Sequence, residues 1–267
     1  MNSRKITGLA LTICTFNLII FASSNALGAS AKKSDAAPPT AGKVRIVIVG
    51  DTTAKDNKGW GPGFKSFLND NAEYYNIAVG GRSSKKFIDE GRWSKALALK
   101  GNYYLIQFGH NDESAKDDSH TDPNTTYRQF ITRYVDEARA NGAKPILITS
   151  LVRRQWDAND SNKIKSVLTP YAEVVKAVAA EKKVPLVDLH ARSKELYEQL
   201  GKDKSNELAA LKDDGSIDNT HLNDKGSVFF GKVIAEELIK LEPDLKPCFR
   251  SEQPSDANST PKVPTGS

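Results

Sequence analysis

Several polar residues of this chain could together carry out acyl transfer, and the first of them follows a strand-like run, Val44–Val49. There the sequence Gly-Asp-Thr-Thr places the hydroxyl of Thr52 at an expected strand-to-helix turn, where backbone N–H groups and the helix dipole favour negative charge. His221 is the candidate base, and Asp218, three residues earlier, is near enough to hold its second ring nitrogen. A hydroxyl, a base and an orienting carboxylate are the parts that nucleophilic catalysis needs.

Two further residues could donate hydrogen bonds to the oxyanion that such a reaction forms. Gly81, in "GGRSS", can bring a bare N–H close to the reacting atom, and Asn111, in "FGHND", offers a side-chain amide. Each motif alone also has a structural interpretation: a threonine N-cap, a tight glycine turn or an Asx turn. The occurrence of all of them at expected strand ends favours a catalytic site.

The elements that must position these residues alternate between strand-like runs and segments of helical period. We expect strands at Val44–Val49, Tyr74–Ala78, Tyr103–Phe108, Pro145–Ser150 and Pro185–Leu189, and helices near Gly63–Asn69, Ser84–Leu99, Thr126–Asn141, Val167–Glu181 and Asp224–Leu241. This alternation predicts an α/β fold with right-handed crossovers and a parallel sheet covered on both faces. In such sheets functional groups gather in the loops at the carboxyl ends of the strands.

Five motifs in block order resemble those of the SGNH (GDSL-type) hydrolases, and among these the rhamnogalacturonan acetylesterases are most similar. The motifs are "VGDTTA", "GWG", "NIAVGGRSSKKF", "IQFGHND" and "DNTH", and the resemblance extends over roughly residues 44–241. It implies a three-layer α/β/α sandwich with a five-stranded parallel sheet. It also implies the removal of acetyl groups from pectic polysaccharide without a metal or cofactor.

The resemblance assigns a role to each candidate residue. Thr52 occupies the nucleophile position, Asp218 and His221 complete the triad, and the N–H of Thr52, Gly81 and Asn111 form the oxyanion hole. The family has serine where this chain has Thr52; the extra methyl group restricts χ1 and could crowd the attack. Two alternatives therefore stay open, a catalytically impaired relative that binds glycans and a polysaccharide acetyltransferase.

Other polar groups near the strand ends could bind substrate or serve the fold. Arg82 and Trp156 are candidate substrate contacts, a cation for galacturonate carboxylates and a ring for stacking on a sugar. Arg82 and four further basic residues either contact such carboxylates or form a solvated rim: Lys85, Lys86, Arg153 and Arg154. Trp60 either stacks on a sugar or packs beneath the turn that carries Thr52. Four residues lack a recognised metal-ligand spacing, so we expect no metal: His110, Asp112, His120 and Asp122. Asp188 and His190, at the end of the last expected strand, are expected to serve as hydrogen-bonding or capping groups.

The composition is that of one soluble domain, with 39% hydrophobic and 27% charged residues among 267. The net charge of +5 comes without a Lys/Arg block, so nucleic acid is not an expected partner. Residues 1–28 read as a signal peptide, which implies a secreted or periplasmic protein without stable membrane insertion after cleavage; a retained anchor is the alternative. Beyond it we expect a flexible linker at 29–42, the hydrolase domain at 43–246 and a disordered tail at 247–267. A monomer that binds an acetylated polysaccharide or oligosaccharide is expected.

Overall fold

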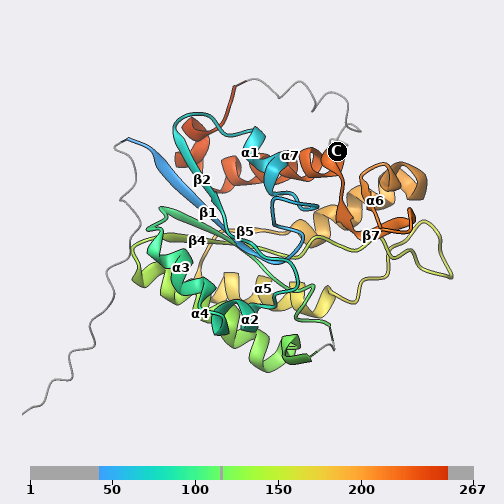
Figure 1. Ribbon diagram of the computed structural model, residues 1–267, viewed down its shortest axis with the longest axis horizontal. Coiled ribbons are helices and arrows are strands. Elements are labelled where there is room, and N and C mark those ends of the chain that lie inside the picture. The colour runs from blue at the N-terminus through green and yellow to red at the C-terminus, as the bar shows by residue number, and fades with distance from the viewer. Residues whose placement is uncertain (1–41, 115–116, 252–267) are drawn as a thin grey trace, which may run out of the picture. The chain divides into compact units, whose positions relative to one another are not determined.

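A parallel β-sheet forms the centre of the computed structural model, which describes residues 42–114 and 117–251 (Figure 1). Its order is β2-β1-β3-β4-β5. The strands are β1 (Val44–Gly50), β2 (Ala72–Asn76), β3 (Tyr103–Gln107), β4 (Lys144–Ile148) and β5 (Leu186–Val187). Every neighbouring pair is parallel. The expected five-stranded parallel sheet is confirmed.

Side chains that alternate along the strands create one hydrophobic core on each face of the sheet. In β1, Ile46 and Ile48 belong to one core, and Val47 and Val49 to the other. The first core is covered by α1 (Gly61–Ser66), α6 (Leu189–Asn206) and α7 (Asp224–Leu241). The second is covered by α2 (Ser84–Asp89), α3 (Arg92–Ala98), α4 (Arg128–Ala140) and α5 (Thr169–Lys182). Figure 1 shows these two helical layers on opposite sides of the strands, so the predicted three-layer α/β/α sandwich is confirmed.

The strand order reverses direction between β1 and β3. The chain leaves β1 through α1 on one face, whereas it leaves β3 through α4 on the other. In open α/β sheets, ligands bind outside the carboxyl ends of the strands at such a switch point. Thr52 follows β1 and Asn111 follows β3, so both lie at this point of the sheet.

Some helices and strands differ from the expectation. The helix predicted over Ser84–Leu99 is two helices, because Gly91 at φ +69° breaks the backbone between α2 and α3. Helix α6 and an antiparallel hairpin of β6 (Ala209–Leu211) and β7 (Ile217–Leu222) were not predicted. Asp218 and His221 therefore lie on a hairpin strand rather than on a turn after a strand of the main sheet.

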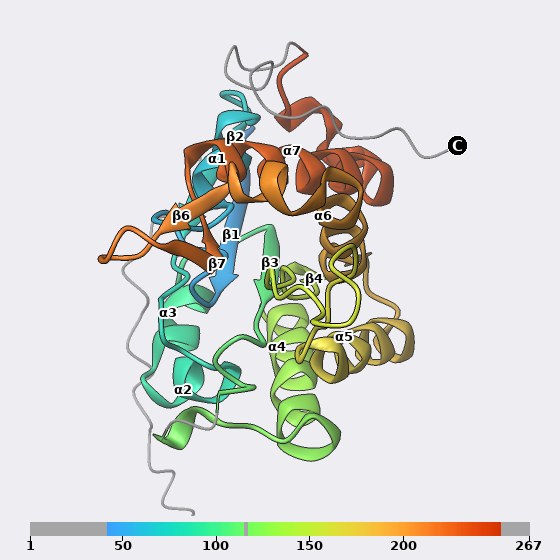
Figure 2. The same cartoon turned by 90° about the vertical axis from the view of Figure 1, so that its right-hand side faces the viewer.

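This hairpin lies against the turn that follows β1. The N–H of Leu222 donates to the carbonyl oxygen of Lys58 at 3.0 Å, and Figure 2 shows β7 beside the carboxyl end of β1. The buried side chains of Ala209 and Leu222 connect the hairpin to the core. Tertiary contacts thus hold a segment whose own sequence is largely polar.

The folded part of the chain continues beyond residue 246, where we expected it to end. A 3₁₀ helix spans Pro243–Cys248, and Phe249 is buried against Phe64. The side-chain amide of Asn69 donates to the carbonyl oxygens of Pro247 and Phe249. The predicted signal peptide, nearly all of the linker and the rest of the tail lie outside the described residues. Within the described ranges, no helix is both long enough and apolar enough to cross a membrane.

Candidate active site

The turn after β1 is packed tightly against the end of β3. A Cβ atom on Gly50 would lie 2.5 Å from the carbonyl oxygen of Gln107, so glycine is needed at this close approach. Thr53 is fully buried, and its hydroxyl accepts a hydrogen bond from the Gln107 side chain at 2.6 Å. Thr52 is half-buried and faces a cleft. Of the two hydroxyls, Thr53 holds the turn and Thr52 is available for chemistry.

The carboxylate of Asp51 holds the turn after β1 through hydrogen bonds. Its buried carboxylate accepts the N–H groups of Thr53 and His110, each at 3.1 Å. Burial alone would raise the pKa of Asp51, but the adjacent His110 ring and these hydrogen bonds outweigh burial and lower it. The charged carboxylate therefore connects the turn after β1 to the loop after β3. Trp60 packs beneath the same turn, as expected, and donates from Nε1 to Gln107 at 2.8 Å.

One predicted oxyanion donor, the N–H of Gly81, lies at the Thr52 hydroxyl. Gly81 adopts φ +74°, in the left-handed region, and its N–H donates to Thr52 Oγ1 at 3.2 Å. Asn111 is held next to this loop, since its side-chain amide donates to the carbonyl oxygen of Arg82 at 3.3 Å. The loop after β2 thus contacts Thr52 through Gly81 and Asn111 through Arg82.

His221 and Asp218 form a hydrogen-bonded pair on β7. Their Nδ1 and Oδ2 atoms are 2.6 Å apart, and the other carboxylate oxygen accepts the N–H groups of Thr220 and His221. Partial burial opposes ionisation, but these bonds prevail and lower the pKa of Asp218 to about 2. An ionised Asp218 can only accept, so Nδ1 of His221 carries the proton and Nε2 is left as the base.

Thr52 and the His221–Asp218 pair line one cleft of about 530 Å³. Between the described Thr52 and His221 there is no direct hydrogen bond; the hydroxyl is engaged by Gly81 instead. Catalytic hydrogen bonds are often long in a free enzyme and shorten when substrate binds. The arrangement suits acyl transfer through a hydroxyl nucleophile.

Arg154 is not part of a solvated rim, which was one of its two predicted roles. Its side chain is 2% exposed, and one guanidinium nitrogen donates to the main-chain oxygens of Asp218 and His221 at 2.5 and 2.6 Å. The other terminal nitrogen donates to the Tyr197 hydroxyl at 2.6 Å. Arg154 therefore supports the strand that carries the base, and its neighbour Arg153 pairs with Glu113.

The lining of the cleft also contains residues that the sequence did not single out, among them Lys55, Lys58 and Lys212. Lys55 and Lys58 follow the Gly-Asp-Thr-Thr motif within six positions, which was a usable signal; nothing in the sequence marked Lys212, which the hairpin brings there. Arg82 and Trp156 are not among the lining residues. Arg82 pairs with Glu90 at 3.1 Å, and Trp156 forms a β-bridge with Ile164. Their contacts with substrate stay predictions.

Asp112, one of the residues considered as metal ligands, holds neighbouring loops together. Asp112 is fully buried and accepts hydrogen bonds from the hydroxyls of Ser84 and Thr121 at 2.5 and 2.8 Å. Burial raises the pKa of its carboxyl to about 7. No group of three or more metal-binding side chains occurs among the residues that the structure describes. Asp188 caps α6, and His190 hydrogen-bonds to Ser166, as expected of both.

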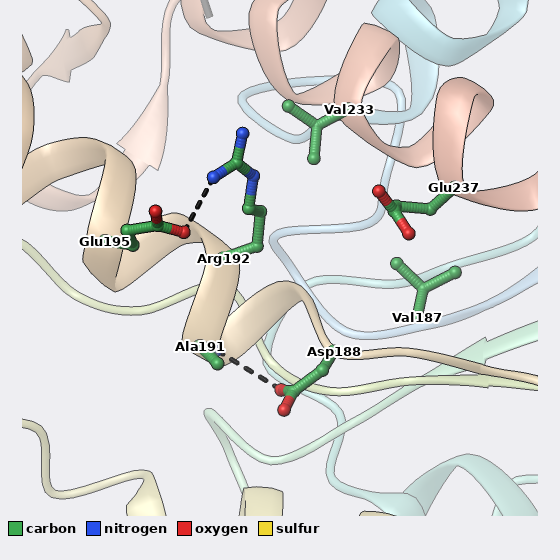
Figure 3. A pocket seen from close by; sticks show the side chains of 7 residues that line it. All are labelled: Val187, Asp188, Ala191, Arg192, Glu195, Val233 and Glu237. Carbon is green, nitrogen blue, oxygen red and sulfur yellow. Dashed lines mark hydrogen bonds and ion pairs between the residues drawn. The ribbon is translucent and has the colours of Figure 1, made fainter. Parts of the chain in front are cut away.

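A second pocket, of about 480 Å³, lies between β5, α6 and α7 (Figure 3). Arg192 pairs there with Glu195 at 2.6 Å, and Asp188 accepts the N–H of Ala191. Its lining includes no serine, threonine, cysteine or histidine. It therefore offers neither a hydroxyl or thiol nucleophile nor a histidine base, whereas the cleft at Thr52 contains a hydroxyl and a histidine.

Comparisons with known proteins show which family the chain is similar to. Residues 46–228 match the model of the GDSL-like Lipase/Acylhydrolase family. The chain is 36% identical over 221 residues to the rhamnogalacturonan acetylesterase RhgT of Bacillus subtilis, with 76% of this chain and 93% of that protein covered. Among solved structures, YxiM of Bacillus subtilis matches with a TM-score of 0.61 at 23% identity, over 74% of this chain and 57% of that one. A catalytic mutant of Axe2, an acetylxylan esterase from Geobacillus stearothermophilus, matches with a TM-score of 0.54 at 17% identity, over 73% and 94%. The two structures show likeness of fold.

Proposed function

The chain belongs to the GDSL-like lipase/acylhydrolase family, and from this premise we propose that it is a carbohydrate esterase that removes acetyl groups through an acyl-enzyme. One observation carries the proposal. Thr52, His221 and Asp218 line a single cleft, and the N–H of Gly81 lies on the Thr52 hydroxyl. This geometry supports the proposal, because acyl transfer needs a hydroxyl, a base and an oxyanion donor at one place.

In the acylation step, Oγ1 of Thr52 attacks the acetyl carbonyl carbon while Nε2 of His221 takes the hydroxyl proton. The charge that develops on the carbonyl oxygen is stabilised by the N–H groups of Gly81 and Thr52 and the side-chain amide of Asn111. Asp218 stabilises the protonated His221 ring through Nδ1. The intermediate collapses when the bond to the sugar oxygen breaks and His221 donates its proton to that oxygen.

In the deacylation step, a water molecule attacks the acetyl ester on Thr52. His221 takes a proton from the water, and the second tetrahedral intermediate expels Oγ1, which recovers the proton from His221. Acetate leaves, and the site returns to its starting protonation state. This is one round of nucleophilic catalysis with the same base used twice.

For the substrate we propose an acetylated pectic polysaccharide of the rhamnogalacturonan type. The support is the 36% identity to RhgT over most of both chains, together with a cleft that contains three lysines. Galacturonate units carry carboxylates, which a cationic cleft attracts. The expected signal peptide would place the protein outside the cytoplasm, where such polymers occur.

The test is acetate release from acetylated rhamnogalacturonan and turnover of p-nitrophenyl acetate by the purified protein. We expect both activities, together with an acetyl group on Thr52 detectable by mass spectrometry after quenching. If glycan binding is seen without hydrolysis, the catalytically impaired alternative replaces this proposal. If acetyl groups appear on an added sugar acceptor instead of as acetate, the acetyltransferase alternative does.

A further inference from the structure

Three lysines at the catalytic cleft have no part in the acyl-transfer steps. Lys55 and Lys58 belong to the turn that carries Thr52, whereas Lys212 lies in the hairpin that carries His221. They come from the two segments that supply the nucleophile and the base. Each of these two segments therefore contributes positive charge to the cleft.

One of these lysines lies close to the nucleophile. A Cβ atom placed on Gly80 would be 3.4 Å from Lys55 Nζ and 3.5 Å from Thr52 Oγ1. The ammonium and hydroxyl groups therefore flank the same glycine. A sugar that presents its acetyl ester to Thr52 would bring its neighbouring substituents within reach of Lys55.

The three ammonium groups are available to a ligand. Within the described part of the chain, Lys55, Lys58 and Lys212 make no ion pair with a carboxylate. Two carboxylates line the same cleft, but Asp218 is engaged by His221, which leaves Asp213 as the nearby counter-charge. Positive charges that line a concave site focus the electric field there, and they attract anions more strongly than the same charges on an open surface.

We propose that Lys55, Lys58 and Lys212 form a carboxylate-binding subsite that holds a uronate unit of the polymer while a neighbouring acetyl group reaches Thr52. The inference rests on the proposed function, since it assigns the subsite to the same reaction. Lysine suits this role because its ammonium group is a point charge on a flexible side chain and can bind carboxylates in several orientations. The subsite makes the enzyme selective for acidic over neutral acetylated glycans.

The experiment compares two substrates, acetylated polygalacturonate and the neutral acetylxylan, for the wild type and four variants. Lys55→Gln, Lys58→Gln and Lys212→Gln test the subsite singly. Lys95→Gln, on the exposed side of α3 and outside the cleft lining, is the matched control. Each single substitution in the subsite is expected to raise KM for the acidic substrate about threefold relative to acetylxylan, and the triple variant about tenfold or more.

Salt supplies an independent readout. Raising NaCl from about 20 to about 300 mM should raise the wild-type KM for acetylated polygalacturonate and leave that for acetylxylan nearly constant, because partly exposed charges are screened over this range. The triple variant should have lost most of this dependence. The Lys95→Gln control should keep it.

Two results would contradict the proposed carboxylate-binding subsite. Equal losses of kcat on both substrates would mean that the lysines act on the oxyanion or on the fold, and unchanged KM values would mean that they are ordinary surface charges. Failure of the proposed function is distinguishable, because it would appear as absent turnover of p-nitrophenyl acetate and of both polymers by the wild type.

Discussion

The guanidinium group of Arg154 donates a hydrogen bond to the main-chain oxygen of His221, with 2.6 Å between the two atoms. The same nitrogen also donates to the main-chain oxygen of Asp218, so one buried side chain holds both members of the acid–base pair. The two oxygens belong to a short hairpin strand at the edge of the fold. The position of His221 relative to Thr52 thus depends on a residue that is not among those lining the cleft.

Replacing Arg154 by lysine should lower kcat by about 10²-fold with little change in KM. A single ammonium group cannot reach Asp218, His221 and Tyr197 together, and a displacement of about 1 Å at a catalytic group can cost this much. The free energy of unfolding should fall by roughly 2 kcal/mol, since buried acceptors lose their partners. Steady-state kinetics and thermal unfolding measure the two effects.

The matched control for this change is Arg153→Lys. Arg153 is partly exposed, pairs with Glu113 at 2.8 Å and donates to the main-chain oxygen of His110 at 3.1 Å, without a side-chain contact to Asp218 or His221. The control should alter kcat less than threefold, because a partly exposed ion pair contributes little. Equal losses in the two variants would contradict a positioning role for Arg154.

Asp218→Asn should reduce kcat by about 10³- to 10⁴-fold while KM changes little. An amide at this position no longer stabilises the protonated ring and permits the wrong tautomer of His221. The pKa of Asp218 lies near 2. If the wild type loses activity on acidification while the pH is still above about 4, protonation of Asp218 is therefore not the cause. A residual kcat above one tenth of the wild-type value would remove Asp218 from the mechanism.

The low pKa of Asp218 has a consequence for stability as well. A carboxyl whose pKa is lowered in the folded state stabilises that state above its ordinary value, 3.8, and loses this contribution as the pH falls towards 2. The difference in melting temperature between wild type and Asp218→Asn should therefore narrow between about pH 4 and pH 2. Differential scanning calorimetry at these pH values measures it, and a constant difference would contradict the assigned interaction.

Asp112 should produce the opposite pH dependence. Burial raises the pKa of this carboxyl from 3.8 to about 7, so the folded state retains a proton that the unfolded chain has released. Its contribution to stability is present at low pH and is lost as the pH rises from about 4 through 7. The Asp112→Asn variant mimics the protonated form. Its melting temperature should therefore rise relative to that of the wild type as the pH increases from about 5 to about 8. A gap that stays constant or moves the other way would show that Asp112 is ionised throughout.

The sequence predicts the sandwich well because hydrophobic period and strand–helix alternation are local signals. The alternation of Ile46 and Val47 between two cores follows directly from the pleat of a strand that is buried on both faces. The positions of Thr52 and Asn111 follow in turn, because parallel strands end at the same edge of the sheet. These parts of the site needed no tertiary information.

The remaining parts of the site depend on contacts between distant segments. The hairpin strand that carries His221 is mostly polar and is held by Arg154 and by the turn at Lys58, so its own residues give a weak strand signal. Arg153 and Arg154 are adjacent and of the same type, yet the fold buries Arg154 and leaves Arg153 partly exposed. Lys212 likewise reaches the cleft through the hairpin. No local pattern contains this information.

The role of Thr52 is the central claim, and kcat/KM for wild type, Thr52→Ser and Thr52→Ala on p-nitrophenyl acetate, measured side by side, tests it most directly. We expect alanine to lose at least about 10³-fold, because no hydroxyl remains to form the acyl-enzyme. We expect serine to equal or exceed the wild type, because it keeps the hydroxyl and frees χ1 from the methyl group. An alanine variant as active as the wild type would contradict the account, since the ester would then be cleaved without Thr52.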